Sequence, residues 1–423
     1  MDFRNVILLA GGQALMVSAM SVVIITSAEV GKILAPNQLL ITLPVAALFV
    51  AITFTSIPAS LFMEKYGRKT GFVWASLFGV AGAGLATWAI ISKSFWLFVC
   101  GTTLMGIFNG FGNFFRFTAA DIVSKKFKSN AIAYVLAGGI LAAFLGASLA
   151  SNFKEAIPGA TYAGGYASLI AGYCIIFILM SFLKLPANKI AITDSSIIAK
   201  DTEVSNHLQA KPARSLKTII RQPKYSVAVI CGMFGYGVMS FIMTATPPAM
   251  GHTSQAVRTT IPFVIQWHML AMFVPSFFTG TLINRFGVYK IMFIGGLLGL
   301  CCVVVNQFGE SVWHYWSALV LLGLSWNFTF TGATSLLTQT YRPSERGKAQ
   351  AFNDFIVFAT VSIASLSAGA LQHLYGWQTV NVGVIPLLII ILACVIWISF
   401  WDPDRDQDQK RDLRHNQQKI KAV

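Results

Sequence analysis

Charged residues are scarce in this chain. Asp, Glu, Lys and Arg make up only 11% of its residues, whereas a soluble globular protein carries about 25%. Hydrophobic residues make up 55% of the sequence, so most of the chain must lie where water is absent. The composition therefore excludes an ordinary soluble domain.

Motifs of enzymes and metal sites are also missing. The six cysteines lie inside apolar runs without metal-binding spacing, and we interpret them as small buried side chains. The chain has no nucleophile elbow, no phosphate-binding loop and no histidine cluster, which argues against a membrane enzyme. We expect neither a metal nor a cofactor.

The apolar residues are arranged in runs of about 20, the length that crosses a hydrocarbon core of about 30 Å. Backbone polar groups need internal partners in lipid, so each run should be a helix. The alternating pattern of a membrane β-barrel is absent. The first run starts at Val6 without an A-x-A site, so no cleavable signal peptide is expected. The sequence predicts an all-α membrane protein with spans at 6–28, 39–62, 71–91, 95–120, 131–151, 164–185, 225–246, 261–283, 290–308, 312–338, 349–371 and 379–401.

One polar connection is much longer than the others and divides these spans into two sets of six. The predicted organisation is an N-terminal half over 1–185, a central loop over 186–224, a C-terminal half over 225–402 and a charged tail over 403–423.

Basic residues lie almost entirely in segments on one predicted side of the membrane. Of the 31 Lys and Arg residues, 26 fall on the side of the termini and four on the other. This ratio predicts that both termini and the central loop are cytoplasmic, in a bacterial inner membrane. It also explains the net charge of +15 without a nucleic-acid partner.

Two loops, 220 residues apart, carry related motifs. In the first, a small residue and a glycine flank Glu64 and Lys65, and basic residues follow at Arg68 and Lys69. The corresponding residues of the two copies are Ser60, Glu64, Lys65 and Gly67 in the first and Gly280, Asn284, Arg285 and Gly287 in the second. A small residue permits close helix packing, and the glycine permits a tight turn. Such a repeat predicts two related halves around a central site.

With these two copies and twelve spans, the chain resembles the major facilitator superfamily. The signature loop of that family reads G-x-x-x-D-R/K-x-G-R-R/K, and this chain departs from it at Ser60, Glu64 and Asn284. The resemblance covers about residues 1–402. It implies two pseudo-symmetric six-helix bundles around a central cavity, in a secondary transporter that alternates access by rocking its halves. The loop charges either set topology and cap helices or form latches; the expected gate residues are Glu64, Lys65, Gly67, Arg68, Lys69, Asp121, Asn284, Arg285, Gly287 and Arg346.

A polar stripe recurs in spans 4 and 10 with an offset of 218 residues. In the fourth span it contains Asn109, Asn113 and Arg116 at helical spacing. Because polar stripes are costly in lipid, both stripes should face the interior, for substrate contact or interhelical hydrogen bonding. The candidate substrate-binding residues are Arg116, Asn109, Asn113, Asn327, Thr331, Thr334, Tyr236, Trp267 and Trp326.

Arg116 is the basic residue placed well inside a span, which makes it a functional-site candidate with an anionic partner. That partner is either a carboxylate on the substrate or an acid of the protein, with Asp121, Glu64 and Asp354 as candidates. Proton coupling needs a group that is alternately exposed and desolvated, and the candidates for it are Glu29, His268 and Asp354.

We therefore expect a carrier of a small organic solute that works as a monomer in the lipid bilayer. Arg116 favours an anionic or zwitterionic solute, and the dense aromatic residues suit a vitamin or siderophore-like compound. Proton-coupled uptake is one possible mode, and a multidrug/proton antiporter is the alternative. The fifth span lacks a Gly-Pro pair typical of drug antiporters, which favours uptake. A non-transporting receptor is a remote alternative, because no larger soluble module is present in this sequence.

Overall fold

The computed structural model describes residues 3–37, 40–185, 213–251, 254–258 and 260–401. Over these ranges every regular element is a helix, so the all-α prediction is confirmed. Most of the predicted central loop and the tail over 403–423 lie outside the described residues.

The N-terminal helices follow the first six predicted spans. Two spans are divided at short breaks, after Gly112 and at Gly138. The elements are α1 Phe3–Leu34, α2 Leu43–Tyr66, α3 Arg68–Ile91, α4 Phe95–Gly112 with α5 Phe115–Asp121, α6 Lys128–Ala137 with α7 Gly139–Asn152 (after the short turn η2, Lys125–Phe127), and α8 Ala163–Ser181.

The C-terminal helices follow the predicted spans of the second half. The span that holds α12 and α13 is divided beside Pro275, which lacks the backbone N–H of a regular helix. The elements are α9 Leu216–Ile220, α10 Pro223–Gly251, α11 Gln255–Arg258, α12 Ile261–Phe273, α13 Ser276–Phe286, α14 Val288–Gln307, α15 Val312–Leu337, the turn η4 Pro343–Glu345, α16 Arg346–Gly383 and α17 Ile385–Trp401.

Eleven described segments are long and apolar enough to cross a membrane, and the last of them runs for 59 residues from Pro343 to Trp401. Gly376 interrupts this segment with φ 78° and ψ 168°, outside the helical region. The segment is therefore long enough for two crossings of about 20 residues each, which accounts for the twelve predicted spans. Large apolar side chains such as Phe54, Trp74 and Phe400 are exposed around the bundle, as expected of lipid-facing surfaces.

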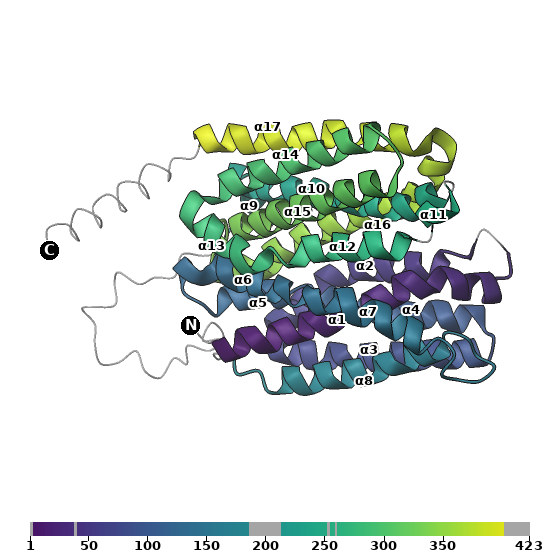
Figure 1. Cartoon of the computed structure of the whole chain (residues 1–423). Helices are drawn as coiled ribbons and strands as arrows, with labels where there is room; N and C mark the ends of the chain where they lie inside the picture. Colours follow the sequence, from purple (N-terminus) through teal and green to yellow (C-terminus); the bar gives the residue numbers. More distant parts are fainter. Residues whose placement is uncertain (1–2, 38–39, 186–212, 252–253, 259, 402–423) are drawn as a thin grey trace, which may run out of the picture.

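The two sets of helices lie side by side with their long axes roughly aligned (Figure 1). They meet through two principal contacts, α2 against α16 and α6 against α13. We call the end that carries Gly67, Lys125–Phe127, Gly287 and Pro343–Glu345 the basic end; α1 begins at this end in Figure 1.

The repeat predicted from the two loop motifs is present in the backbone. Gly67 has φ 89° and ψ 152°, and Gly287 has φ 89° and ψ 148°. Each glycine ends one helix and begins the next in a region that side chains with a Cβ essentially do not occupy. The same turn therefore joins α2 to α3 and α13 to α14.

The small residue of each motif packs against the opposite half. The hydroxyl of Ser60 donates to the carbonyl of Gly347 over 2.7 Å. At the related position, a Cβ on Gly280 would lie 2.5 Å from the Cα of Asn130 and 2.7 Å from the carbonyl oxygen of Ser129. Even a Cβ is thus too large where α13 meets the start of α6, so glycine is favoured at this close contact.

Candidate functional site

A buried ion pair joins the two halves. Arg116 of α5 donates from Nη2 to Oδ1 of Asp354 in α16 over 2.6 Å, and their side chains are 5% and 0% exposed. The amide of Asn353 also donates to Oδ1 of Asp354, over 2.9 Å. Asp354 is one of the three partners considered for Arg116 from the sequence. Because the two side chains form an ion pair, the positive charge of Arg116 is compensated within the protein.

Each member of this pair keeps an unused polar atom. Nε of Arg116 and Oδ2 of Asp354 are buried and have no hydrogen-bond partner. A buried donor or acceptor without a partner costs about 1–3 kcal/mol, and more when the group is charged. The pair therefore offers one donor and one acceptor to a molecule that reaches it.

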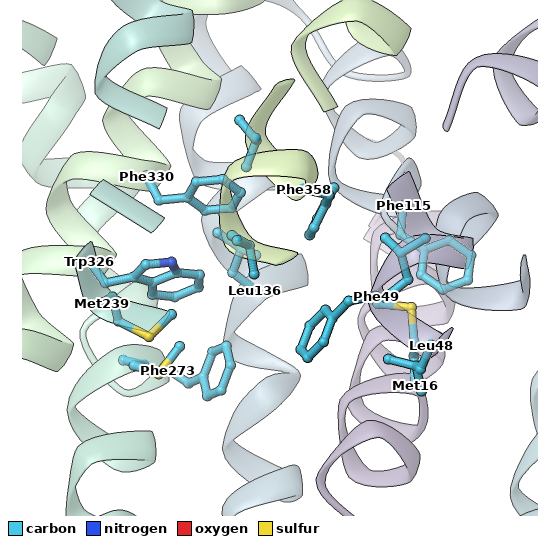
Figure 2. Packing of buried hydrophobic residues seen from close by; sticks show 14 of the residues in the cluster. Met16, Leu48, Phe49, Phe115, Leu136, Met239, Phe273, Trp326, Phe330 and Phe358 are labelled. Carbon is cyan, nitrogen blue, oxygen red and sulfur yellow. The ribbon is translucent and has the colours of Figure 1, made fainter. Parts of the chain in front are cut away.

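Five aromatic rings of the C-terminal half pack together beside this pair; we call them the aromatic cluster. Trp326 and Phe330 of α15 are stacked, with centroids 5.1 Å apart and an interplanar angle of 17°. Tyr236 forms edge-to-face contacts with Trp326, Phe330 and Phe358 at centroid distances of 5.1–5.8 Å, and Phe273 forms one with Trp326 at 5.6 Å. Figure 2 shows four of these rings.

The ion pair and the aromatic cluster form one continuous arrangement. The guanidinium carbon of Arg116 lies 4.9 Å from the centroid of Phe330 and 4.5 Å from that of Phe117, a cation–π geometry. Phe49 of α2 and Leu136 of α6 come from the N-terminal half and point toward the same region (Figure 2). The candidate site therefore lies at the junction of the halves.

Asn109 and Asn327, two asparagines of the polar stripe that the repeat aligns, form hydrogen bonds inside the protein. Asn109 donates to the carbonyl of Met105 in its own helix over 2.8 Å. Asn327 donates to the carbonyl of Met272 and the hydroxyl of Ser276, both over 2.6 Å, and accepts from Thr279 over 2.6 Å. These bonds hold α15 to α12 and α13, which is the interhelical reading of the stripe.

The other residues of the polar stripe differ in burial and in hydrogen bonding. Asn113 caps α4 at the break before α5 and is only partly buried, so Asn109, Asn113 and Arg116 do not share one uninterrupted helix. Thr334 and Thr331 are buried, and the hydroxyl of Thr331 has no hydrogen-bond partner. The indole N–H of Trp326 is likewise buried and unpartnered.

Trp267 does not join the aromatic cluster. It is 42% exposed and packs with Phe263, 6.2 Å away, and Trp316, 5.8 Å away, while Trp316 contacts the exposed Trp313. Trp267 of α12 and Trp313 of α15 are exposed, and exposed tryptophans on membrane helices are typical of an interfacial belt. The structure thus places Trp267 apart from the other proposed substrate contacts.

Two of the three candidates for proton coupling lie away from the ion pair. Glu29 forms an i,i+3 pair with Lys32 over 2.7 Å, and their side chains are 46% and 59% exposed. His268 is buried in α12, where Nδ1 lies 2.7 Å from the carbonyl of Leu319 and Nε2 has no partner. Asp354 alone of the three lies at the junction with α5.

The first loop motif builds a polar network across the basic end. Arg68 donates to Thr118 over 2.9 Å, to Asp121 over 3.0 Å and to Gln350 of the other half over 2.6 Å. Arg346 lies 3.9 Å from Asp121. This network joins α3 and α5 to α16, which is the arrangement that a latch requires.

The remaining gate candidates are more exposed. Glu64 lies against Gly347, and Lys65 and Arg285 cover the rings of Tyr66 and Phe286. Lys69, with Arg68, Asp121 and Arg346, lines a cavity of about 290 Å³ at this end. In the second motif, the amide of Asn284 donates to Asn130 of the N-terminal half.

The sequence did not predict a set of hydrogen bonds that holds the chain just before α9. Arg214 donates from Nε and Nη2 to the two carboxylate oxygens of Glu345 over 2.8 and 2.6 Å, and Lys348 donates to the Arg214 carbonyl over 2.9 Å. These hydrogen bonds with Glu345 raise the pKa of Arg214. Arg214 lies 131 positions from Glu345 and 134 from Lys348 in the chain, so no local sequence pattern predicts these contacts.

The helical fold, the repeated turn and the buried junction define the class of protein: a polytopic membrane transporter built from two related halves. The model of the Major Facilitator Superfamily matches residues 7–245 and 228–422. The chain belongs to the major facilitator superfamily, as its loop motifs predicted.

The chain is similar to the riboflavin transporter RfnT of Brucella anthropi. The two are 36% identical over 394 residues, which cover 93% of this chain and 95% of that protein. Among solved structures, a variant of the Escherichia coli fucose:proton symporter FucP has a TM-score of 0.68 at 15% identity, over 93% of this chain and 98% of that one. The human organic anion transporter MFSD10 has a TM-score of 0.70 at 14% identity, over 93% and 99%. At these identities the two structures support the fold alone.

Proposed function

We propose that this protein imports riboflavin or a closely related flavin across the bacterial inner membrane by alternating access. The observation that carries the proposal is the aromatic cluster beside a charge-compensated Arg116–Asp354 pair. The likeness to a riboflavin transporter over nearly the whole chain supports the same substrate class.

A neutral, planar solute suits this site better than an anion. Arg116 already has a carboxylate partner at 2.6 Å, so an anionic solute would have to compete with Asp354 for it. Stacked and edge-on rings bind planar aromatic ligands through area and quadrupole interactions. Within the expectations drawn from the sequence, the proposal therefore keeps the aromatic vitamin and sets aside the anionic or zwitterionic solute.

The contacts at the basic end support an alternating-access cycle. Ser60 with Gly347, Arg68 with Gln350 and Arg116 with Asp354 all join the halves on the side of Gly67. Farther from this end, the hydroxyl oxygens of Thr53 and Ser362 form a hydrogen bond over 3.2 Å. With the topology predicted from the basic residues, these contacts would close the cytoplasmic side, and their breakage would open it.

The proposal includes proton coupling and assigns it to the carboxyl group of Asp354. It lies in the site and contacts both halves through Arg116 and Asn353, so it can exchange partners when the halves rock. Arg116, Trp326, Tyr236 and Phe330 would bind the solute, and the network around Arg68 and Asp121 would act as the gate. We propose that the monomer is the working unit, with both termini in the cytoplasm.

Uptake of radiolabelled riboflavin into proteoliposomes tests this function. We expect uptake that exceeds empty liposomes, saturates and increases with an inward proton gradient. Trp326→Phe should reduce riboflavin uptake, whereas the same change at the exposed Trp313 should leave it unchanged. Absence of riboflavin transport in either direction by the wild type would refute the proposal, and export alone would support the antiporter alternative.

A further inference from the structure

We infer that Arg116 and Asp354 recognise the imide edge of a planar heterocycle. In this arrangement Oδ2 of Asp354 accepts a hydrogen bond from a ring N–H, and Nε of Arg116 donates one to the adjacent ring carbonyl. The aromatic cluster contacts the face of the same ring system. The inference rests on the proposed function and specifies which edge of the flavin the protein reads.

The first support is the geometry of the ion pair. An arginine and a carboxylate commonly form two parallel hydrogen bonds, yet Nη2 and Oδ1 form the bond at 2.6 Å here and the adjacent Nε has no partner. Nε–H and one Nη2 hydrogen point along the same edge of a guanidinium, by covalent geometry. The unused donor therefore lies beside the existing contact, and Oδ2 belongs to the same carboxylate.

The second support is burial. Both unused atoms are shielded from solvent, and buried polar groups are normally satisfied by a partner. The pair is neutral overall, so the partner that satisfies both atoms is itself neutral and carries one donor next to one acceptor. A carboxylate or phosphate would supply acceptors only and would face Oδ2 of Asp354 with like charge.

The third support is the position of the pair beside the rings. Arg116 covers Phe330, which stacks on Trp326. A ligand whose polar edge meets the ion pair thus places its planar body within reach of these rings. The isoalloxazine of a flavin combines a broad aromatic surface with a C=O–NH–C=O edge, which fits both features.

The experiment compares riboflavin with 3-methylriboflavin, which lacks the imide N–H. Binding to the purified full-length protein is measured by quenching of flavin fluorescence, which needs no transport. Loss of a hydrogen bond to a charged, buried acceptor should weaken binding of the methylated flavin about tenfold or more in the wild type. In Asp354→Asn this difference between the two flavins should shrink to less than about threefold.

Asp121→Asn is the matched control, because it makes the same change in a carboxylate that pairs with Arg68 at the basic end. It should keep the wild-type ratio between the two flavins. The comparison of the two flavins in the wild type requires no variant, so it still tests the inference if Asp354→Asn folds poorly.

Equal affinity of the wild type for both flavins would overturn the imide reading while leaving riboflavin transport intact. An unchanged ratio in Asp354→Asn would overturn the assignment to this carboxylate. Failure of the wild type to bind either flavin would overturn the proposed function, and this inference with it.

Discussion

We predict that Arg116 and Asp354 make strongly interdependent contributions to the free energy of unfolding. The variants are Arg116→Met, Asp354→Asn and the double substitution. Each single variant leaves one charge buried without its partner, which costs about 3–5 kcal/mol. Because Asn353 still donates to Asp354, and the rings of Phe117 and Phe330 still cover Arg116, we expect values near 3 kcal/mol for each.

The double variant removes both charges and should recover most of this loss. A neutral amide that remains in the site costs about 1–2 kcal/mol, so the coupling free energy of the cycle should be about 4 kcal/mol. The free energy of unfolding is measured by denaturant titration of the purified protein in one fixed detergent. Each variant is compared with the wild type at the same pH and salt.

The exposed pair of Lys32 and Glu29 is the control. Its side chains are 59% and 46% exposed, so the cycle of Lys32→Met and Glu29→Gln should give a coupling below about 1 kcal/mol. If the central cycle gave a value this small, or if the double variant lost the sum of the two single losses, the reasoning about the buried pair would be refuted.

The repeat and the predicted topology can be tested by substitution. Gly67→Ala should lose about 1–3 kcal/mol of unfolding free energy, because the backbone at this turn is essentially restricted to glycine; unfolding of the purified variant measures it. Gly280→Leu should slow riboflavin uptake about fivefold or more, because the added side chain meets the Asn130 backbone and costs the closed state about 1–3 kcal/mol. A Ser205→Cys variant should react with a membrane-impermeant thiol reagent from the cytoplasmic side only, above the background of the native cysteines, in labelling of oriented vesicles.

These predictions have matched controls. Gly84→Ala adds a methyl in the interior of α3 where no atom lies within 4 Å, so it should be neutral or gain up to about 1 kcal/mol; a similar result at Gly67 would contradict the turn argument. Gly280→Ser places a much smaller side chain against the same Asn130 backbone and should retain more uptake than leucine. Labelling of Ser205→Cys from the outer side would overturn the predicted topology.

Several parts of the candidate site could be predicted from local patterns. The glycines of the two loops were identified from the repeat, and both adopt the same backbone angles. Arg116 was singled out because a basic residue inside a span needs a partner, and Asp354 was among its candidates. Tyr236 and Trp326 were named as aromatic candidates, and they lie 5.4 Å apart at the junction.

Other parts depended on contacts that no sequence window contains. Trp267 and Trp326 look alike in sequence, yet one lies in an exposed group and the other in the aromatic cluster. Asn327 matches Asn109 by the offset of the repeat, but its three hydrogen bonds go to the break between α12 and α13. The rotation of each helix about its own axis decides which neighbours these side chains contact, and tertiary packing sets that rotation.

The sequence by itself determined the helical membrane class, the two related halves and the family, because hydrophobic run length and the loop motifs are local properties. Tertiary structure decided which acid neutralises Arg116. Asp354 lies 238 positions away in the chain, and only the meeting of α5 with α16 brings the two together. That choice turns a candidate anion-binding arginine into half of a neutral pair, and so changes the kind of solute that we propose for the candidate site.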